Sequence, residues 1–111
     1  MSWNERGWTV QRMIEDKREA LATLCRRFRV RRLDLFGSAA SGGFRLESSD
    51  LDFLVEFDEL RDNEYADSYF GLLEELKRLF ERDVDLVMAA AVKNPYFRES
   101  IERSRTLLYA A

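Results

Sequence analysis

The chain has 111 residues, of which 46% are hydrophobic and 35% are charged, and its formal net charge is −3 with a pI near 5.1. These values predict one globular domain and argue against a disordered or fibrous protein. The acidic balance argues against direct nucleic-acid binding. The absence of histidine excludes Ser-His-Asp and Cys-His mechanisms and every histidine-ligated metal site. Any chemistry must therefore use carboxylates, hydroxyls, lysine, arginine or a hard metal ion.

Neither the hydrophobic residues nor the cysteine content points to a membrane or secreted protein. No apolar run reaches the roughly 18 residues that suggest a membrane-spanning helix. Charged residues interrupt the N-terminal segment, which is unlike a signal peptide. Cys25 is the only cysteine, so no internal disulfide can form, and we expect a location in the reducing cytoplasm.

The first half of the chain contains one predicted helix and two predicted strands. Apolar residues recur at three-to-four spacing over residues 11–28, which predicts an amphipathic helix with one buried stripe. Residues 30–36 are typical of a short strand that ends at Gly37, and a loop rich in Gly and Ser follows. Over residues 51–57, apolar residues at the odd-numbered positions alternate with Asp52, Leu54 and Glu56. This period of two predicts a second strand.

The second half adds two helices and one strand. A helical stripe predicts a helix over residues 64–80, and residues 84–88 are typical of a third short strand. A last helix is predicted from Asn94-Pro95 to about Ser104, because Asn caps free amides and Pro suits the first turn. Residues 107–109 are expected to pack as a tail. The order of elements predicts a single α/β domain of the α+β type, with helices packed on a small mixed sheet.

A Gly-Ser pair, Gly37-Ser38, stands where the first predicted strand ends. Gly allows a tight bend and a close approach of the backbone to a ligand. The amides of such a turn and the Ser38 hydroxyl can donate hydrogen bonds to phosphate oxygens. An ordinary strand-ending turn has the same sequence, so this pair alone is a weak signal.

Two aspartates, Asp50 and Asp52, stand at the start of the second predicted strand. Side chains two apart in a strand point to the same side, so the two carboxylates are adjacent. Their repulsion costs stability unless a cation lies between them, and oxygen ligands of this kind suit Mg²⁺. A solvated strand start is the alternative interpretation of the pair by itself.

Asp85 is a third acid, within the otherwise apolar strand 84–88. An aspartate in such a strand is costly to bury without a partner. If this strand lies beside the one that bears Asp50 and Asp52, the three acids converge. Two Mg²⁺ ions could then hold a triphosphate and activate an attacking oxygen. Asp83 could share the same face, but an aspartate at a strand's beginning is ordinary.

Together these segments resemble a known family. The sequences Leu35-Phe36-Gly37-Ser38, Ser49-Asp50-Leu51-Asp52 and Val84-Asp85-Leu86-Val87 are similar to those of minimal nucleotidyltransferases in the DNA polymerase beta superfamily. These are antitoxin-type proteins encoded beside HEPN-domain toxins. The resemblance extends over nearly the whole chain in length and order, and it implies the polymerase-beta-like nucleotidyltransferase fold over residues 1–111.

The resemblance also implies a site and a reaction. Gly37 and Ser38 would bind nucleotide phosphate, while Asp50, Asp52 and Asp85 would bind Mg²⁺ and carry catalysis. Family antitoxins can transfer AMP from ATP to a tyrosine of a HEPN-type RNase toxin, which silences it. The expected partners are therefore such a toxin and ATP, and the attacking hydroxyl would lose its proton with help from metal and a carboxylate, Asp85.

Two other functions remain open from the sequence. The protein could be an antitoxin that neutralises its toxin by binding alone, with a vestigial site. It could also be a transferase that acts on RNA ends or on a small molecule of the aminoglycoside type. Against the last alternative, no part of the sequence is left to form a separate substrate domain, which favours a protein acceptor.

Overall fold

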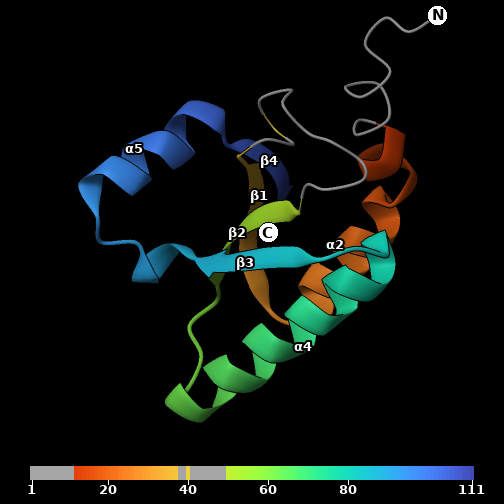
Figure 1. Cartoon of the computed structure of the whole chain (residues 1–111). Coiled ribbons are helices and arrows are strands. Elements are labelled where there is room, and N and C mark those ends of the chain that lie inside the picture. The colour runs from red at the N-terminus through yellow and green to blue at the C-terminus, as the bar shows by residue number, and fades with distance from the viewer. Residues whose placement is uncertain (1–11, 38–39, 41–49) are drawn as a thin grey trace, which may run out of the picture.

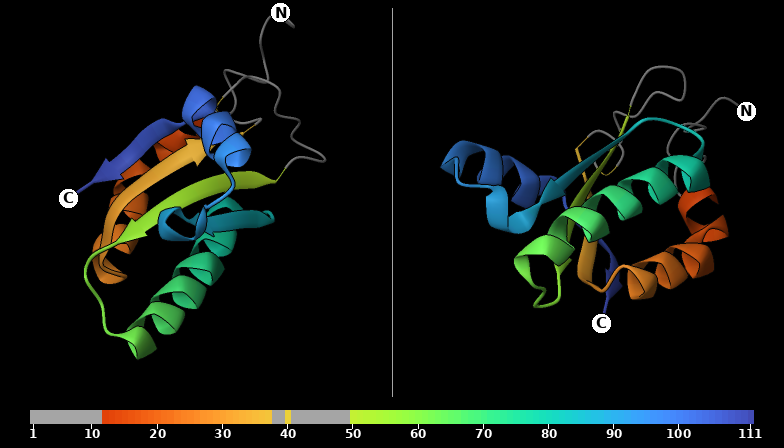
Figure 2. Two further views of the ribbon diagram at one scale, coloured as in Figure 1. Left: turned by 90° about the vertical axis from the view of Figure 1, so that its left-hand side faces the viewer. Right: turned by 90° about the horizontal axis from the view of Figure 1, so that it is seen from below.

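The computed structural model describes residues 12–37, 40 and 50–111, and it arranges them as two helical layers with a sheet between them. In Figures 1 and 2, the sheet lies between α5 on one side and α2 and α4 on the other. The predicted α+β fold, with helices on a small mixed sheet, is confirmed. In chain order the elements are α2 (Arg18–Arg27), β1 (Val30–Phe36), β2 (Leu51–Phe57), α4 (Asp62–Phe80), β3 (Val84–Met88), the 3-10 helix η1 (Ala89–Ala91), α5 (Pro95–Ser104) and β4 (Thr106–Ala110).

The four strands form one mixed sheet in the order β3-β2-β1-β4. β1 is antiparallel to both β2 and β4, and β2 is parallel to β3. The parallel pair requires a long crossover, and α4 provides it. As a consequence, the end of β1 and the beginnings of β2 and β3 meet at the same edge of the sheet.

The main core lies between the sheet and the two helices α2 and α4. All four odd-numbered residues of β2, from Leu51 to Phe57, are buried in it, together with Leu72 and Leu76 of α4. Because side chains alternate along a strand, Asp52 points to the opposite face of the sheet. A slip of one residue would move Asp52 into the core and Phe53 out of it, so the hydrophobic pattern holds the register.

The predicted strands have the predicted bounds, and two of the helices differ little from expectation. α4 begins at Asp62, two residues earlier than predicted. The Glu64 carboxylate accepts a hydrogen bond from the Arg61 amide at 2.8 Å, which satisfies a free donor at the helix start. α5 begins as predicted, because Asn94 Oδ1 accepts hydrogen bonds from the amides of Tyr96 and Phe97.

Two predictions about the ends of the chain are wrong in detail. The helix predicted over residues 11–28 is interrupted: residues 12–16 are helical, Lys17 is a turn residue with φ −106° and ψ 5°, and α2 ends at Arg27. No Gly or Pro marks this turn in the sequence. The expected tail at residues 107–109 is part of β4, which hydrogen-bonds along β1. Only Leu108 of β4 is buried, so the segment has too short an apolar pattern to be recognised as a strand.

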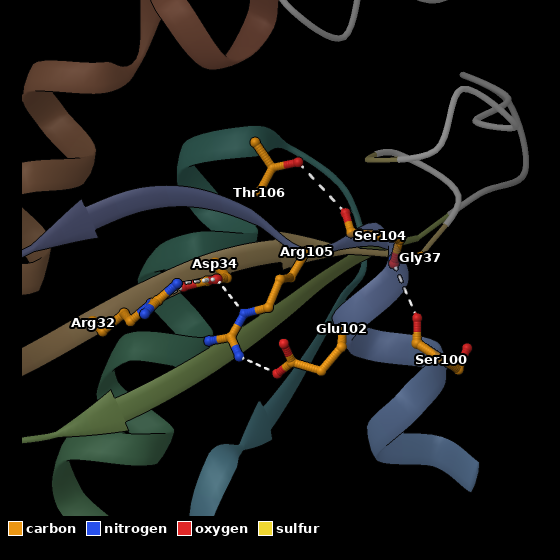
Figure 3. Close-up of polar contacts among 8 residues, drawn as sticks. All are labelled: Arg32, Asp34, Gly37, Ser100, Glu102, Ser104, Arg105 and Thr106. Carbon is orange, nitrogen blue, oxygen red and sulfur yellow. Dashed lines mark hydrogen bonds and ion pairs between the residues drawn. The ribbon is translucent and has the colours of Figure 1, made fainter.

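The second face of the sheet has a small core of its own and a buried charge. Phe36, Leu54 and Val92 pack with Ile101 of α5. Beside them, Asp34 of β1 is fully buried and accepts hydrogen bonds from Arg32 at 2.8 Å and from Arg105 at 2.7 Å (Figure 3). Burial acts to raise the pKa of Asp34, but the two guanidinium groups outweigh it and hold that pKa below its ordinary value of 3.8. This ion-pair network attaches the end of α5 to the middle of the sheet.

Among residues 12–37, 40 and 50–111, no helix is both long enough and apolar enough to cross a membrane.

The Asp34 network yields a stability prediction. We expect Arg105→Met to lower the free energy of unfolding at pH 7 by about 2 kcal/mol, because the buried Asp34 carboxylate loses a charged donor. A carboxylate whose pKa is lowered by folding stabilises the fold above its ordinary pKa. The difference between wild type and variant should therefore shrink as the pH falls below 3.8, as chemical denaturation at several pH values can measure.

Arg103→Met is the matched control for this experiment. Arg103 lies on the same helix and pairs with Glu99 at 2.7 Å, but its side chain is 73% exposed. Its removal should change stability by no more than about 0.5 kcal/mol. Equal effects of the two substitutions would contradict a stabilising role for the buried network.

Candidate active site

Four of the residues predicted to carry chemistry, Gly37, Asp50, Asp52 and Asp85, lie at the sheet edge where β1 ends and β2 and β3 begin. Asp52 of β2 stands directly opposite Phe36 of β1 and directly opposite Asp85 of β3. Directly paired residues on neighbouring strands place their side chains on the same face, so the two carboxylates are side by side. Asp50 immediately precedes β2 and is exposed.

The electrostatics of Asp52 reflect this crowding. Burial, the negative charges of Asp85 and Asp50, and a side-chain hydrogen bond with Asp85 raise the pKa of Asp52 from 3.8 to about 6. A hydrogen bond between two carboxyl groups requires a proton between them. The raised pKa shows that the second negative charge is costly at this position, and either a proton or a cation would relieve that cost.

Asp85 differs from the sequence expectation in one respect. Its position inside an apolar strand suggested a buried acid, but Asp85 is exposed. The strand's buried residues, Val84 and Leu86, face the core with α4, and Asp85 between them faces away from it. The exposure removes the burial cost that the sequence argument assumed, and it leaves the Asp85 carboxylate accessible to a ligand.

Gly37 is the residue that allows Asp52 to take its place. Its φ of +75° lies in the left-handed region, which L-residues with side chains rarely adopt. A Cβ atom on Gly37 would lie 2.4 Å from Asp52 Oδ2, which no real contact allows. The left-handed φ therefore favours Gly, and any side chain at position 37 would also force the Asp52 carboxylate to shift. Ser38, the second half of the predicted phosphate-binding pair, lies outside the described residues.

The Gly37 amide has a partner that sequence reasoning missed. It donates a hydrogen bond to the Ser104 hydroxyl oxygen at 3.0 Å, so in this structure it is not free to donate to a phosphate. Ser104 is the last residue of α5, far from Gly37 in the chain, and nothing in the local sequence marks it. The Asp34–Arg105 pair on the same face was missed for the same reason.

The carboxylates of Asp50, Asp52 and Asp85 are ligands that suit a hard divalent cation, although the three side chains do not converge on one point. Carboxylate oxygens that repel each other are typical ligands of Mg²⁺. The structure pairs Asp52 with Asp85 and leaves Asp50 exposed at the start of the strand. Across the part of the chain that the structure describes, no three acidic or sulfur-bearing side chains are arranged to hold one metal ion.

A cavity of about 230 Å³ opens on the same face of the sheet as Asp52. Leu54, two residues after Asp52, lines it together with Ile101, Arg98 and Arg105 of the α5 segment. Apolar and charged groups thus face one space on the sheet face that bears Asp52, although the carboxylates of Asp52 and Asp85 do not line it.

Known proteins of similar sequence identify the family of this chain. Residues 17–108 match the model of the nucleotidyltransferase domain, and the chain belongs to that family. A protein from Methanocaldococcus jannaschii, named "putative protein adenylyltransferase", is 35% identical over 94 residues, which is 85% of this chain and 92% of that protein. The predicted recognition as a nucleotidyltransferase is confirmed.

Two solved structures have the same fold at lower identity. One is a tri-AMPylated Shewanella oneidensis HEPN toxin in complex with MNT antitoxin, with 19% identity, a TM-score of 0.62 and coverage of 88% of this chain and 73% of the matched chain. The other is a toxin–antitoxin with AMP-PNP, with 22% identity, a TM-score of 0.65 and coverage of 85% and 73%. At these identities the likeness concerns the fold.

The close approach of Gly37 to Asp52 yields a double-mutant prediction. Gly37→Ala should destabilise the protein, because the left-handed φ costs about 1–2 kcal/mol and the new methyl group strikes Asp52 Oδ2. In an Asp52→Ala background only the φ cost should remain. The coupling energy from a thermodynamic cycle should therefore be at least about 1 kcal/mol.

Gly71→Ala of α4 is the control for this cycle. A Cβ atom there would lie 2.4 Å from the Phe28 ring, in the packing between helices and away from the carboxylates. Its cost should be the same with Asp52 or Ala at position 52. If Gly37→Ala cost the same in both backgrounds, the contact between Gly37 and Asp52 would not be what requires Gly.

Proposed function

We propose that this protein is a Mg²⁺-dependent nucleotidyltransferase that moves AMP from ATP to a tyrosine hydroxyl of a HEPN-type toxin. The observation that carries the proposal is the pair of carboxylates, Asp52 and Asp85, on adjacent strands beside the Gly37 turn. Membership in the nucleotidyltransferase family supports the reaction class. The name of the archaeal relative supports a protein acceptor, and the complexes of an AMPylated toxin and of AMP-PNP support the toxin and the donor.

In this proposal the site residues have defined tasks, within a single domain that spans residues 1–111. Asp50, Asp52 and Asp85 hold two Mg²⁺ ions, and Gly37 with Ser38 shapes the turn that receives the triphosphate. Bound Mg²⁺ supplies neutralisation of the triphosphate charge and a lower pKa for the attacking hydroxyl. Mg²⁺ needs two or more anionic oxygens as ligands. Such oxygens are crowded around Asp52, where burial and the charges of Asp85 and Asp50 raise the pKa of its carboxyl group.

The reaction itself is a simple displacement. The tyrosine oxygen forms a bond to the α-phosphorus of ATP. The bond between that phosphorus and the oxygen that bridges it to the β-phosphorus breaks, and pyrophosphate leaves. The proton of the hydroxyl passes to a carboxylate. Asp85 suits this task because it is exposed and can be reached by an incoming side chain. We propose the cytoplasm as the location, where ATP is available and the free thiol of Cys25 is stable.

The carboxylate pair and the net charge favour transfer to a protein over neutralisation by binding alone and over transfer to RNA ends. An antitoxin that only masks its toxin gains nothing from two repelling charges on neighbouring strands, which lower stability. A transferase for RNA ends would have to bring a polyanion to a chain whose net charge is −3. A neutral hydroxyl on a folded protein partner meets neither objection, so it is the acceptor that we favour.

The metal assignment can be tested by thermal unfolding. ATP with MgCl₂ should raise the melting temperature of the wild-type protein, because ligands that bind only the folded state stabilise it by about 2.7 kcal/mol at 100 times Kd. Asp52→Asn should lose this joint effect. Glu56→Gln is the control, since Glu56 lies on the same strand and face but pairs with Arg31. A joint shift that survives Asp52→Asn would remove Asp52 from the metal site.

The transfer reaction can be tested with a HEPN-type toxin, which the proposal expects to be encoded beside this protein. Incubation with ATP and MgCl₂ should make the toxin heavier by one or more AMP units on tyrosine, with release of equal pyrophosphate. Asp50→Asn and Asp52→Asn should each slow transfer by at least about 100-fold, the usual effect of losing a charge-stabilising group. Intact-mass spectrometry and tryptic mapping measure the product.

The same variants separate catalysis from masking. Both should still bind the toxin in size-exclusion chromatography, because the site carboxylates need not form the docking surface, but neither should restore growth of cells that express it. An unmodified toxin together with full rescue by either variant would overturn the transfer reaction as the biological function and favour the binding-only antitoxin.

A further inference from the structure

Ser104 links the last turn of α5 to the turn beside the carboxylates. Its hydroxyl oxygen accepts the hydrogen bond from the Gly37 amide at 3.0 Å, and its hydroxyl proton can be donated to the Ser100 carbonyl oxygen at 3.5 Å. Figure 3 shows Ser104 and Gly37 side by side, with Ser100 one helical turn away. The hydroxyl thus bridges a backbone donor of the sheet edge and a backbone acceptor of the helix.

The helix that carries Ser104 is held firmly on both sides of it. Ile101 is buried in the small core, and Arg105 bonds to the fully buried Asp34 at 2.7 Å. Ser104 lies between these two attachments in the chain, so the position of its hydroxyl relative to the sheet is well determined. A hydrogen-bond acceptor fixed in this way can set the direction of the Gly37 peptide.

The direction of that peptide matters because Gly37 and Asp52 share a tight space. Gly37 holds a left-handed φ of +75°, and a Cβ atom there would lie 2.4 Å from Asp52 Oδ2. Rotation or displacement of the Gly37 backbone would therefore change the space that the Asp52 carboxylate occupies. The carboxylate in turn lies beside Asp85, its direct partner on β3.

We propose that Ser104 is a positioning residue of the active site. Its hydroxyl holds the Gly37 turn against Asp52 and so keeps the Asp52 carboxylate in its position beside the Asp85 carboxylate. Ser104 does not touch the reacting atoms, and it acts through Gly37. The consequence for catalysis rests on the proposed nucleotidyltransferase function, whereas the consequence for the Gly37 turn does not.

The first test measures the turn directly, in the full-length protein without ligands. Ser104→Ala should speed hydrogen exchange of the Gly37 amide by at least about tenfold in NMR, because that amide loses its acceptor. Ser104→Thr keeps the hydroxyl and should restore slow exchange. Ser100→Ala is the matched control, since the same substitution one turn earlier removes a hydroxyl but keeps the carbonyl oxygen that Ser104 uses.

The second test measures the carboxylates. Ser104→Ala should raise by about tenfold the MgCl₂ concentration that gives half of the ATP-dependent rise in melting temperature. AMP transfer to the toxin should slow by a similar factor in kcat, with the KM for the toxin unchanged, because Ser104 orients the site and does not bind the acceptor. Ser104→Thr should recover both values, and Ser100→Ala should match wild type in both.

Each result decides the proposal. Unchanged Gly37 exchange in Ser104→Ala, or equal effects of Ser100→Ala and Ser104→Ala, would overturn it. Faster exchange with unaltered Mg²⁺ dependence would also overturn it, since the turn would then not govern the carboxylates. A wild-type protein that binds Mg²⁺ and ATP but modifies no toxin would refute the proposed function and leave the exchange and metal measurements to decide the role of Ser104.

Discussion

The register between β2 and β3 is the constraint on which the rest of the site depends. It places Asp52 directly beside Asp85, and two carboxylates at this separation repel each other unless a proton or a cation lies between them. The opposite face of the same strands provides the compensation. Leu51 and Phe53 of β2 and Val84 of β3 are buried against the helices, and they would be exposed if either strand slipped by one residue. Hydrophobic burial on one face therefore holds an electrostatically unfavourable pair on the other.

α5 is attached to the sheet face that bears the carboxylates mainly by polar contacts, and only a few apolar side chains add to them. Its small core joins only a few side chains, whereas Arg105 reaches the buried Asp34 and Ser104 reaches the Gly37 amide. A fully buried aspartate with two guanidinium partners is costly to disturb, because removal of one partner leaves charge without compensation. This makes α5 a rigid support for the site, and the two residues at its end have separate tasks: Arg105, directly after the helix, attaches it to the sheet, and Ser104, its last residue, contacts the turn.

The structure gives Gly37 a different role from the one that the sequence predicted. In the sequence it belongs to a predicted phosphate-binding pair, where its conformational freedom would let the backbone approach the ligand. In the structure its missing side chain makes room for Asp52, and its amide is already bonded to Ser104. Gly37 therefore shapes the carboxylate site itself.

The sequence by itself determined most of the elements, and it predicted which acids would lie near one another. Alternation along residues 51–57 and the helical stripe over residues 64–80 were sufficient, since both follow from burial of one face of a local element. The Asp50-Leu51-Asp52 spacing predicted two adjacent carboxylates, of which the structure places Asp52 in β2 and Asp50 directly before it, and the apolar neighbours of Asp85 drew attention to the third acid. These features depend on neighbours in the chain, so a local pattern can reveal them.

Only the tertiary structure decided the contacts between distant segments. The pairing of β4 with β1, the burial of Asp34 between Arg32 and Arg105, and the bond from Gly37 to Ser104 all join residues whose local sequences are unremarkable. The exposure of Asp85 was likewise decided by which face of β3 the helix α4 covers. Such contacts arise from the packing of whole elements against each other, and no periodicity within a single segment encodes which partner a side chain will meet.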